Sequence, residues 1–294
     1  MESGAPRRTN GKVAHAAKPE LLFWPGEGIL KGELVDYYRH MGPVIVPHLR
    51  GRPVDLVAFP HGIGGQEERR PSFVPRIPGW IDQRRQEQPH MHQVQDLETL
   101  GWFVNQDVVE FRTWLSRIDN PHRPDQVGFD LIPGVRARFE DTRAVALLLR
   151  RLLDLIGVMS YIKTTGGAGL HVVVGIRRDY TFTQVMEWAR LAARVLVQAA
   201  PRLATINFTT QRDPHKVLID YRQNDFGKAL ASPYSVRALP GAPVSTPVTW
   251  EELEEGRVQP AQFTIRTLPE RMRRMGDVWR LLIDQEQPLP LIDD

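Results

Sequence analysis

Apolar strand segments alternate with two long amphipathic helices in the second half of the chain, and this alternation constrains the fold most strongly. The helices are predicted over 142–156 and 181–198, where apolar residues recur at helical spacing. Thr181 and Gln184 fit a capping box at the start of the second helix, and Gly157 is placed to end the first. Because each helix must bury its apolar face, we expect an α/β or α+β core with helices packed on a sheet.

The strands of this core are predicted from short apolar runs bounded by glycine, proline or polar residues. The predicted strands are 127–132, 159–163, 170–176, 205–210 and 217–221. Earlier in the chain we predict helices near 31–41 and over 97–105, a strand over 108–114, and loops with short strands over 60–93. Further helices are predicted near 249–255 and 269–282.

The composition along the chain suggests one folded domain behind a short leader. Residues 1–18 are polar and basic without periodicity, and we expect a flexible leader there. Residues 19–285 are predicted to form a single domain. Within it we expect an N-terminal module over about 19–120 and a catalytic-type core over about 121–285.

Cysteine is absent, which excludes disulfides, thiolate zinc sites and thiol nucleophiles. No apolar run is long enough to cross a bilayer and no signal peptide is visible, so we expect a cytoplasmic protein without a membrane partner. Arginine outnumbers lysine by 32 to 6, yet the net charge is only +3. The arginine excess is compatible with nucleic-acid binding, but it also fits a coding bias with many arginines paired to carboxylates.

Three predicted strands each carry one ionisable residue inside an apolar run. These residues are Asp130, His171 and Asp220. Burying an unpaired carboxylate costs several kcal/mol, so each residue needs a partner, a metal or a wet cleft. One such residue would indicate a structural group, whereas three in one region favour a site on one sheet face. Two carboxylates from neighbouring strands commonly hold Mg²⁺ or Mn²⁺.

A glycine-rich turn over 164–169 lies directly before the strand that carries His171. Exposed backbone N–H groups in such a turn can bind phosphate oxygens, although the pattern taken alone favours a tight hairpin turn. No Gly-Lys-Ser/Thr follows it, which excludes a Walker A loop. The turn precedes a strand rather than opening a helix, so it is not a dinucleotide fingerprint either.

Specific sequence blocks over about 21–282 are similar to those of a known family. They are Phe23-Trp24-Pro25, Lys31 with Asp36-Tyr37-Tyr38, Gly51-Arg52-Pro53, Glu110-Phe111 with Trp114 and Ser116-Arg117, Arg123-Pro124-Asp125, Phe129-Asp130-Leu131, Lys163-Thr164-Thr165-Gly166-Gly167 with Gly169-Leu170-His171, Val217-Leu218-Ile219-Asp220-Tyr221 with Gln223-Asn224, Ser232-Pro233-Tyr234-Ser235 with Arg237, the 240–245 block and Phe263-Thr264-Ile265. In these blocks the chain resembles the polymerase domain of bacterial DNA ligase D, a member of the archaeo-eukaryotic primase superfamily that acts in non-homologous end joining.

The resemblance implies a primase-type core with an RRM-like sheet, flanked by helices and a small N-terminal module. It also implies nucleotidyl transfer to DNA ends from NTPs or dNTPs, with two Mn²⁺ or Mg²⁺ ions. Asp130 and Asp220 match the catalytic and metal-binding positions. The residues implied for nucleotide binding are Thr165, Gly166, Gly167, Gly169, His171, Lys228, Ser232 and Arg237. Lys31 and Arg112 are implied for DNA binding, and Ku and a separately encoded ligase are implied as partners.

The chain departs from the family pattern at several of these positions. Ile132 stands where the family has a second aspartate, and alternation along a strand turns it to the same face as Asp130. Ala168 replaces a usual lysine, and Arg112 a usual histidine. After Gly51-Arg52-Pro53 the sequence continues through 54–58 without the basic residues that contact a downstream phosphate in the family.

Three functions therefore stay open. The chain is an end-joining polymerase with an altered metal site, a catalytically inactive paralogue that binds nucleic acid or nucleotide, or a structural partner in a repair complex. An aliphatic side chain cannot ligate a metal, so loss of a carboxylate is expected to weaken binding of the second ion most.

Overall fold

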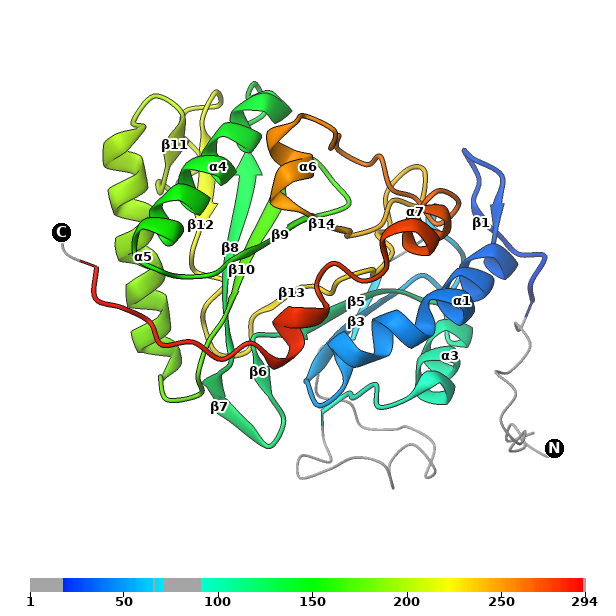
Figure 1. The fold of residues 1–294 in the computed structure, drawn as a ribbon. Helices are drawn as coiled ribbons and strands as arrows, with labels where there is room; N and C mark the ends of the chain where they lie inside the picture. Colours follow the sequence, from blue (N-terminus) through cyan, green and yellow to red (C-terminus); the bar gives the residue numbers. More distant parts are fainter. Residues whose placement is uncertain (1–17, 66, 71–90, 293–294) are drawn as a thin grey trace.

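The computed structural model describes residues 18–65, 67–70 and 91–292. A six-stranded and a four-stranded β-sheet, each with helices packed beside it, dominate the described part of the molecule, and two two-stranded sheets accompany them (Figure 1). Residues 1–17 of the leader predicted over 1–18, and residues 66 and 71–90 of the loop region predicted over 60–93, lie outside the described residues. No helix in the described ranges is both long enough and apolar enough to cross a membrane.

The larger sheet has six strands in the order β11-β12-β8-β10-β9-β14. The bounds are β8 Gln126–Pro133, β9 Tyr161–Thr164, β10 Leu170–Gly175, β11 Ala204–Thr205, β12 Val217–Asp220 and β14 Pro247–Val248. Helices α4 (Phe139–Leu155) and α5 (Phe182–Ala199) pack against it (Figure 1). The four central strands of this sheet are β12, β8, β10 and β9. Along the chain, these strands and the two helices follow the order β8-α4-β9-β10-α5-β12, which is a β-α-β-β-α-β pattern. This order confirms the expected RRM-like sheet in a mixed α/β fold.

The smaller sheet has four strands in the order β13-β5-β3-β4. Its strands are β3 Val54–Ala58, β4 Glu68–Arg70, β5 Val108–Trp114 and β13 Ala229–Ala231. Helices α1 (Lys31–Leu49) and α3 (Leu97–Asn105) pack against each other beside this sheet (Figure 1). Because β13 comes from the second half of the chain, this sheet uses residues from both sides of the boundary predicted near residue 120.

Short elements complete the described fold. They are β1 Leu22–Trp24, β2 Ile29–Leu30, β6 Ser116–Arg117, β7 Asn120–Pro124, α6 Trp250–Glu254, α7 Leu268–Met275 and the 3₁₀ helix η1 Arg280–Asp284. One hydrophobic core cluster contains buried residues of both sheets and of their covering helices. The two sheets therefore share a continuous apolar interior.

The predicted helix near 31–41 is longer than expected and continues to Leu49 through Pro43 and Pro47. A proline inside a helix removes one backbone hydrogen bond, which is why the sequence suggested an earlier end. The helix continues because Met41, Ile45 and Leu49 keep helical spacing and are buried. Burial of this apolar face outweighs the local cost of the prolines.

Two other predicted elements were wrong in extent. The strand predicted over 205–210 is limited to Ala204–Thr205, because side chains satisfy the following backbone N–H groups in successive turns. The Thr205 hydroxyl accepts from Asn207 N at 3.0 Å, and the Asn207 side chain accepts from Thr209 N at 3.0 Å. The helix predicted over 269–282 is divided into α7 and η1 at Gly276, whose φ of +65° is incompatible with a continuing helix.

Candidate active site

The strand register brings the three ionisable strand residues together at the centre of the larger sheet. Asp130 on β8 lies directly opposite His171 on β10 and directly opposite Asp220 on β12. Residues directly opposite on neighbouring strands project from the same face. The sequence prediction that these three residues share one sheet face is therefore confirmed.

A buried chain of polar contacts leads from Ser245 through Lys163 and His171 to Asp130. The Lys163 ammonium nitrogen lies 2.5 Å from Ser245 Oγ and 2.8 Å from His171 Nδ1. His171 Nε2 lies 3.3 Å from Asp130 Oδ1. A carboxylate can only accept a hydrogen bond, so the neutral ring carries its proton on Nε2, toward Asp130, and Nδ1 accepts from Lys163.

The electrostatics of this chain keep the imidazole neutral. Burial, followed by the neighbouring Lys163, lowers the pKa of His171 to about 4, against an opposing effect of Asp130. Burial and the nearby Arg237 also lower the pKa of Lys163 well below its ordinary value. At neutral pH His171 is therefore an uncharged donor beside Asp130.

The glycine-rich turn between β9 and β10 is held rigidly against β8. Gly166 has a φ of +75°, which L side chains rarely adopt, and the Thr165 hydroxyl accepts from Gly167 N at 3.1 Å. A Cβ atom at Gly169 would lie 2.6 Å from the Leu131 carbonyl oxygen. The turn therefore needs glycine at 169 so that its backbone can lie next to the strand that carries Asp130.

A cavity of about 380 Å³ lies over these residues, with walls from both sheets. Its lining residues are Arg112, Asp130, Ile132, Pro133, Thr165, Gly167, Ala168, Gly169, His171, Gln223, Ala229, Leu230, Ala231, Arg237 and Leu239. Asp220 is not one of these lining residues, but its Oδ2 accepts from the lining residue Gln223 at 3.0 Å. The cavity thus combines the Asp130 carboxylate with the glycine-rich turn and two arginines.

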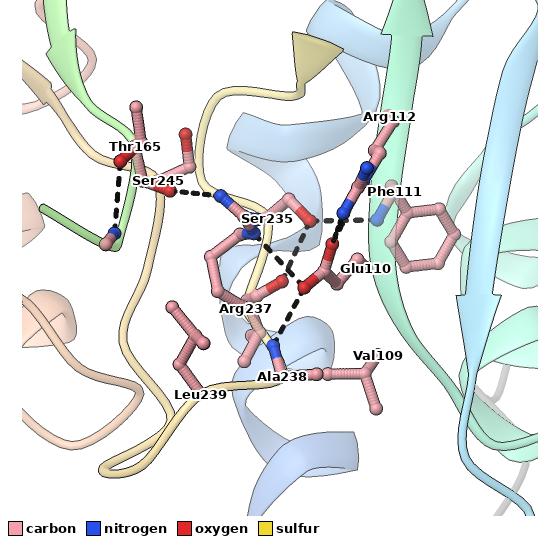
Figure 2. Close-up of polar contacts among 12 residues, drawn as sticks. Val109, Glu110, Phe111, Arg112, Thr165, Ser235, Arg237, Ala238, Leu239 and Ser245 are labelled. Atoms are coloured by element: carbon pink, nitrogen blue, oxygen red, sulfur yellow. Dashed lines mark hydrogen bonds and ion pairs between the residues drawn. The ribbon is translucent and has the colours of Figure 1, made fainter. Parts of the chain in front are cut away.

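Both arginines of the cavity bind one buried carboxylate, Glu110 (Figure 2). Arg112 Nη2 lies 2.7 Å from Glu110 Oε2, and Arg237 Nε lies 3.1 Å from Glu110 Oε1. The Ala238 backbone N–H also donates to Glu110 Oε1 at 2.9 Å. Burial raises the pKa of Glu110, but Arg237, Arg112 and the Ala238 N–H more than offset this, so its pKa lies below the ordinary value.

Three further predicted site residues, Lys228, Ser232 and Lys31, are not among the residues that line this cavity. Lys228 is exposed in the loop before β13. Ser232 is fully buried after β13, where its backbone N–H donates to Phe111 O at 2.9 Å. Lys31 is 2% exposed and its ammonium lies 2.5 Å from Asp107 Oδ1, so the predicted DNA contact by Lys31 is not supported by its surroundings.

Asp130 and Asp220 are carboxylates of this sheet face that could hold a metal ion. They lie directly opposite each other on neighbouring strands, and carboxylate oxygens are ligands that hard divalent cations prefer. Ile132 follows on the same face, opposite Leu218, and contributes no oxygen ligand. Among the described residues, no cluster of three or more histidine, cysteine, aspartate or glutamate side chains could hold a metal.

Sequence reasoning missed Lys163, Glu110 and Gln223 as members of the site. Lys163 lies in a short apolar strand, so the signal that identified Asp130 could have identified it too. Glu110 likewise lies between the apolar residues Val109 and Phe111 of β5, so the same signal could have identified it. The contact from Gln223 to Asp220 depends on the turn after β12, which no sequence pattern indicated.

Comparison with known proteins finds relatives of this chain. The sequence model of one family, described as the LigD primase-polymerase domain, matches residues 30–279. The multifunctional non-homologous end joining protein LigD of Pseudomonas aeruginosa is 30% identical over 284 residues, which cover 94% of this chain and 34% of that protein. The bifunctional non-homologous end joining protein LigD of Bacillus subtilis is 29% identical over 271 residues, covering 89% of this chain and 43% of that protein.

A solved structure is similar along most of the chain. The polymerase domain from Mycobacterium tuberculosis Ligase D, in complex with DNA, superimposes with a TM-score of 0.84 at 25% identity. The match covers 92% of this chain and 98% of that one. The chain thus spans about a third of the length of the Pseudomonas relative and nearly all of the separate polymerase domain.

Proposed function

The chain belongs to the LigD primase-polymerase family, and from this premise we propose that it transfers nucleotides to DNA ends in double-strand break repair. We propose that it does so with an incomplete metal site. The observation that carries the proposal is the direct pairing of Asp130 with Asp220 beside His171, under a cavity that also contains Arg237. Paired carboxylates beside phosphate-binding groups are what phosphoryl transfer requires.

LigD polymerase domains are metal-dependent nucleotidyltransferases. Here Asp130 and Asp220 would hold one ion, Mn²⁺ or Mg²⁺, whose chemistry is to neutralise phosphate charge and to activate the primer hydroxyl. His171 orients the Asp130 carboxylate through its Nε2–H, and Lys163 fixes the tautomer that makes this possible. The backbone of the turn at Thr165, Gly166, Gly167 and Gly169 and the guanidinium of Arg237 would hold the triphosphate.

The proposed substrates are DNA ends and NTPs or dNTPs, and the proposed partners are Ku and a separately encoded ligase. The M. tuberculosis neighbour was solved with DNA, which supports a DNA substrate for this chain. We propose a cytoplasmic site of action and a single folded unit over about 19–285. The exposed Lys228 is the proposed contact at the edge of the site, and Ser232 would support the adjacent strand.

Primer extension tests the proposal directly. The protein is incubated with a primer–template, Mn²⁺ and either NTPs or dNTPs, and the products are resolved by length. We expect extension by the wild type and a loss of roughly a hundredfold or more for Asp130→Asn, because a ligand of the reacting centre is removed. Asp154→Asn, on the exposed face of α4, is the matched control and should extend like the wild type.

The second candidate is an inactive paralogue that binds nucleic acid or acts as a structural partner in a repair complex. The observation that favours it is the loss of charged groups at Ile132 and Ala168, both of which line the cavity. DNA binding measured by fluorescence anisotropy separates the outcomes. Binding without extension under all metal conditions would establish the inactive paralogue, whereas absence of both at low salt would leave only the structural role.

A further inference from the structure

Tyr234 is held in a left-handed backbone conformation three residues before Arg237. Its φ is +64°, although it is a bulky residue without the conformational freedom of glycine, and its side chain is buried. A residue of this kind adopts such a conformation at a cost in free energy and keeps it only where surrounding contacts impose it. At Tyr234 these contacts come from α1, from the segment after α7 and from Ser245.

The hydroxyl of Tyr234 is fixed by Asp277, which lies shortly after α7. The hydroxyl donates to Asp277 Oδ1 at 2.7 Å, and His48 Nε2 on α1 donates to Asp277 Oδ2 at 2.9 Å. Burial raises the pKa of Asp277, but the contacts from His48 and Tyr234 outweigh this, so its pKa lies below the ordinary value. Tyr234 therefore donates to an ionised carboxylate, which makes a strong hydrogen bond. We name Tyr234, Asp277 and His48 the tyrosine clamp.

The backbone on both sides of Tyr234 is fixed as well. The Tyr37 hydroxyl on α1 donates to Tyr234 O at 2.8 Å. Tyr234 N donates to Ser245 O at 2.7 Å, and Ser245 N donates to Ser235 O at 2.9 Å. The chain reversal at Tyr234 is therefore held between helix α1 and one residue of the neighbouring segment.

The reversal at Tyr234 determines where Arg237 lies. Ser235 Oγ accepts from a backbone N–H of β5 at 2.9 Å, which fixes the segment against the smaller sheet (Figure 2). Arg237 Nε then lies 3.1 Å from Glu110 Oε1, and its Nη1 donates to Thr165 O at 2.6 Å (Figure 2). Because only two residues separate Tyr234 from Arg237, a change in the φ of Tyr234 would move the guanidinium away from both partners.

We propose that Tyr234 is a positioning residue for nucleotide binding, and that the tyrosine clamp holds the turn that places the Arg237 guanidinium for the triphosphate. This inference rests on the proposed function, in which Arg237 contacts the triphosphate. Among the described residues that line the active-site cavity, none belongs to the tyrosine clamp. Asp277 instead lines a separate cavity of about 680 Å³ between α1 and α7. The clamp therefore acts through Arg237, from outside the site.

The clamp orders Arg237 before the nucleotide arrives. Without it, the turn at Tyr234 can relax to the negative φ values that a tyrosine prefers. Ordering the Arg237 side chain then adds to the entropy lost when the nucleotide binds. The effect belongs to nucleotide affinity, whereas DNA affinity and the chemical step do not depend on it.

Two measurements on the full chain with Mn²⁺ separate these quantities. Primer extension at varied NTP concentration gives KM and kcat, and anisotropy of a fluorescent ATP analogue gives nucleotide affinity without turnover. Tyr234→Phe removes only the hydroxyl that Asp277 binds. We expect nucleotide KM and Kd to rise roughly threefold to tenfold, the range for one lost hydrogen bond, with kcat and DNA affinity within about twofold of the wild type.

Tyr161→Phe is the matched control. The Tyr161 hydroxyl on β9 lies 3.4 Å from Gln285 and belongs to a different contact, so its removal should leave nucleotide affinity unchanged. Asp277→Ala should reproduce the effect of Tyr234→Phe. Asp277→Asn, which keeps an oxygen that can accept from the Tyr234 hydroxyl, should recover part of the loss.

Arg237→Gln distinguishes positioning from general destabilisation. In the Arg237→Gln background, Tyr234→Phe should change nucleotide affinity by less than about twofold, because the guanidinium that the clamp positions is already absent. If the two substitutions multiply in their effects, in variants that melt like the wild type, Tyr234 does not act through Arg237. Unchanged nucleotide affinity in Tyr234→Phe would also overturn the inference.

Failure of the proposed function gives a different result. If the wild type extends the primer and Tyr234→Phe matches it in KM and Kd, the proposed function stands and the role of Tyr234 is refuted. If the wild type binds nucleotide without extending the primer, the polymerase function fails, and the Kd values of the variants still decide the role of Tyr234. Absence of both nucleotide binding and extension with Mn²⁺ present would remove both proposals.

Discussion

At the scale of single residues, Ile132 is the position with the largest consequence for chemistry. It lies two residues after Asp130 on the central strand, opposite Leu218, and both apolar side chains occupy the sheet face that carries Asp130 and Asp220. Because isoleucine stands at 132, the carboxylates that this part of the sheet face offers to a metal ion are those of Asp130 and Asp220.

Restoring the carboxylate is expected to restore metal affinity. Ile132→Asp, alone and together with Ala168→Lys, should bind Mn²⁺ at least about tenfold more tightly than the wild type, because an added charged ligand joins Asp130 and Asp220. Isothermal titration calorimetry measures the affinity, and primer extension should increase in parallel. Val135→Asp, at a residue 94% exposed just beyond β8, is the control for added negative charge and should change neither.

The outcome for Ile132→Asp discriminates between two explanations of the site. Tighter metal binding with faster extension means that the scaffold is competent and only the ligand set is altered. An unchanged Mn²⁺ affinity in a folded variant would contradict the placement of residue 132 beside the two aspartates.

At the scale of elements, the hairpin of β9 and β10 determines where the glycine-rich turn lies. The backbone at Gly169 approaches the Leu131 carbonyl so closely that no side chain fits between them. Thr165 N donates to Gly169 O at 3.1 Å, which closes the turn. The position of the backbone N–H groups of the turn therefore depends on the contact between this turn and β8.

Gly169→Ala is expected to displace this turn and to destabilise the protein. The added Cβ would lie 2.6 Å from a backbone oxygen that cannot move freely, so we expect a loss of about 1–3 kcal/mol in the free energy of unfolding. Urea denaturation measures it. Gly26→Ala, where nothing lies within 4 Å of the added Cβ, is the control, and an equal small effect of both variants would contradict the close approach.

At the scale of the whole molecule, a buried ion-pair cluster connects the two sheets. The Asp125 carboxylate, just before β8, accepts hydrogen bonds from Nη1 and Nη2 of Arg52 at 2.6 and 2.7 Å. It also accepts one from Nε of Arg117 at 2.7 Å. Arg52 precedes β3 of the smaller sheet. Burial raises the pKa of Asp125, but Arg52 and Arg117 outweigh it, and the pKa lies below its ordinary value.

Asp125→Asn should therefore destabilise the fold strongly and in a pH-dependent way. Leaving two buried or half-buried arginines without their carboxylate is expected to cost about 3–5 kcal/mol. Because the folded pKa of Asp125 is lowered, its contribution is complete above the unfolded value near 3.9 and is lost as the pH falls through the folded pKa. The difference between wild type and variant should shrink below about pH 4.

Chemical denaturation at pH 7 and at a series of acidic pH values measures this difference. Asp119→Asn, which breaks an exposed pair between Asp119 and Arg178, is the matched control and should cost less than about 1 kcal/mol. A loss for Asp125→Asn no larger than for the control would show that the buried cluster does not hold the sheets together.

The sequence by itself determined the α/β character, the position of both long helices, and the three strand residues Asp130, His171 and Asp220. These follow from periodicity and from the cost of burying charge, both of which act locally along the chain. The resemblance in sequence also located the departure at Ile132. The ends of elements were less predictable because burial of a continuous apolar face, as in α1, outweighed local signals such as Pro43 and Pro47.

Only the tertiary structure decided how these residues act together. The pairing of Asp130 with both neighbours depends on strand register, and the convergence of Arg112 and Arg237 on Glu110 depends on strand β13 and the segment after it returning to the smaller sheet. Contacts between residues more than 120 positions apart, such as Glu110 with Ala238, leave no periodic trace in a single sequence. The charge balance of the cavity is therefore a property of long-range packing, whereas the residues available to it are a property of the sequence.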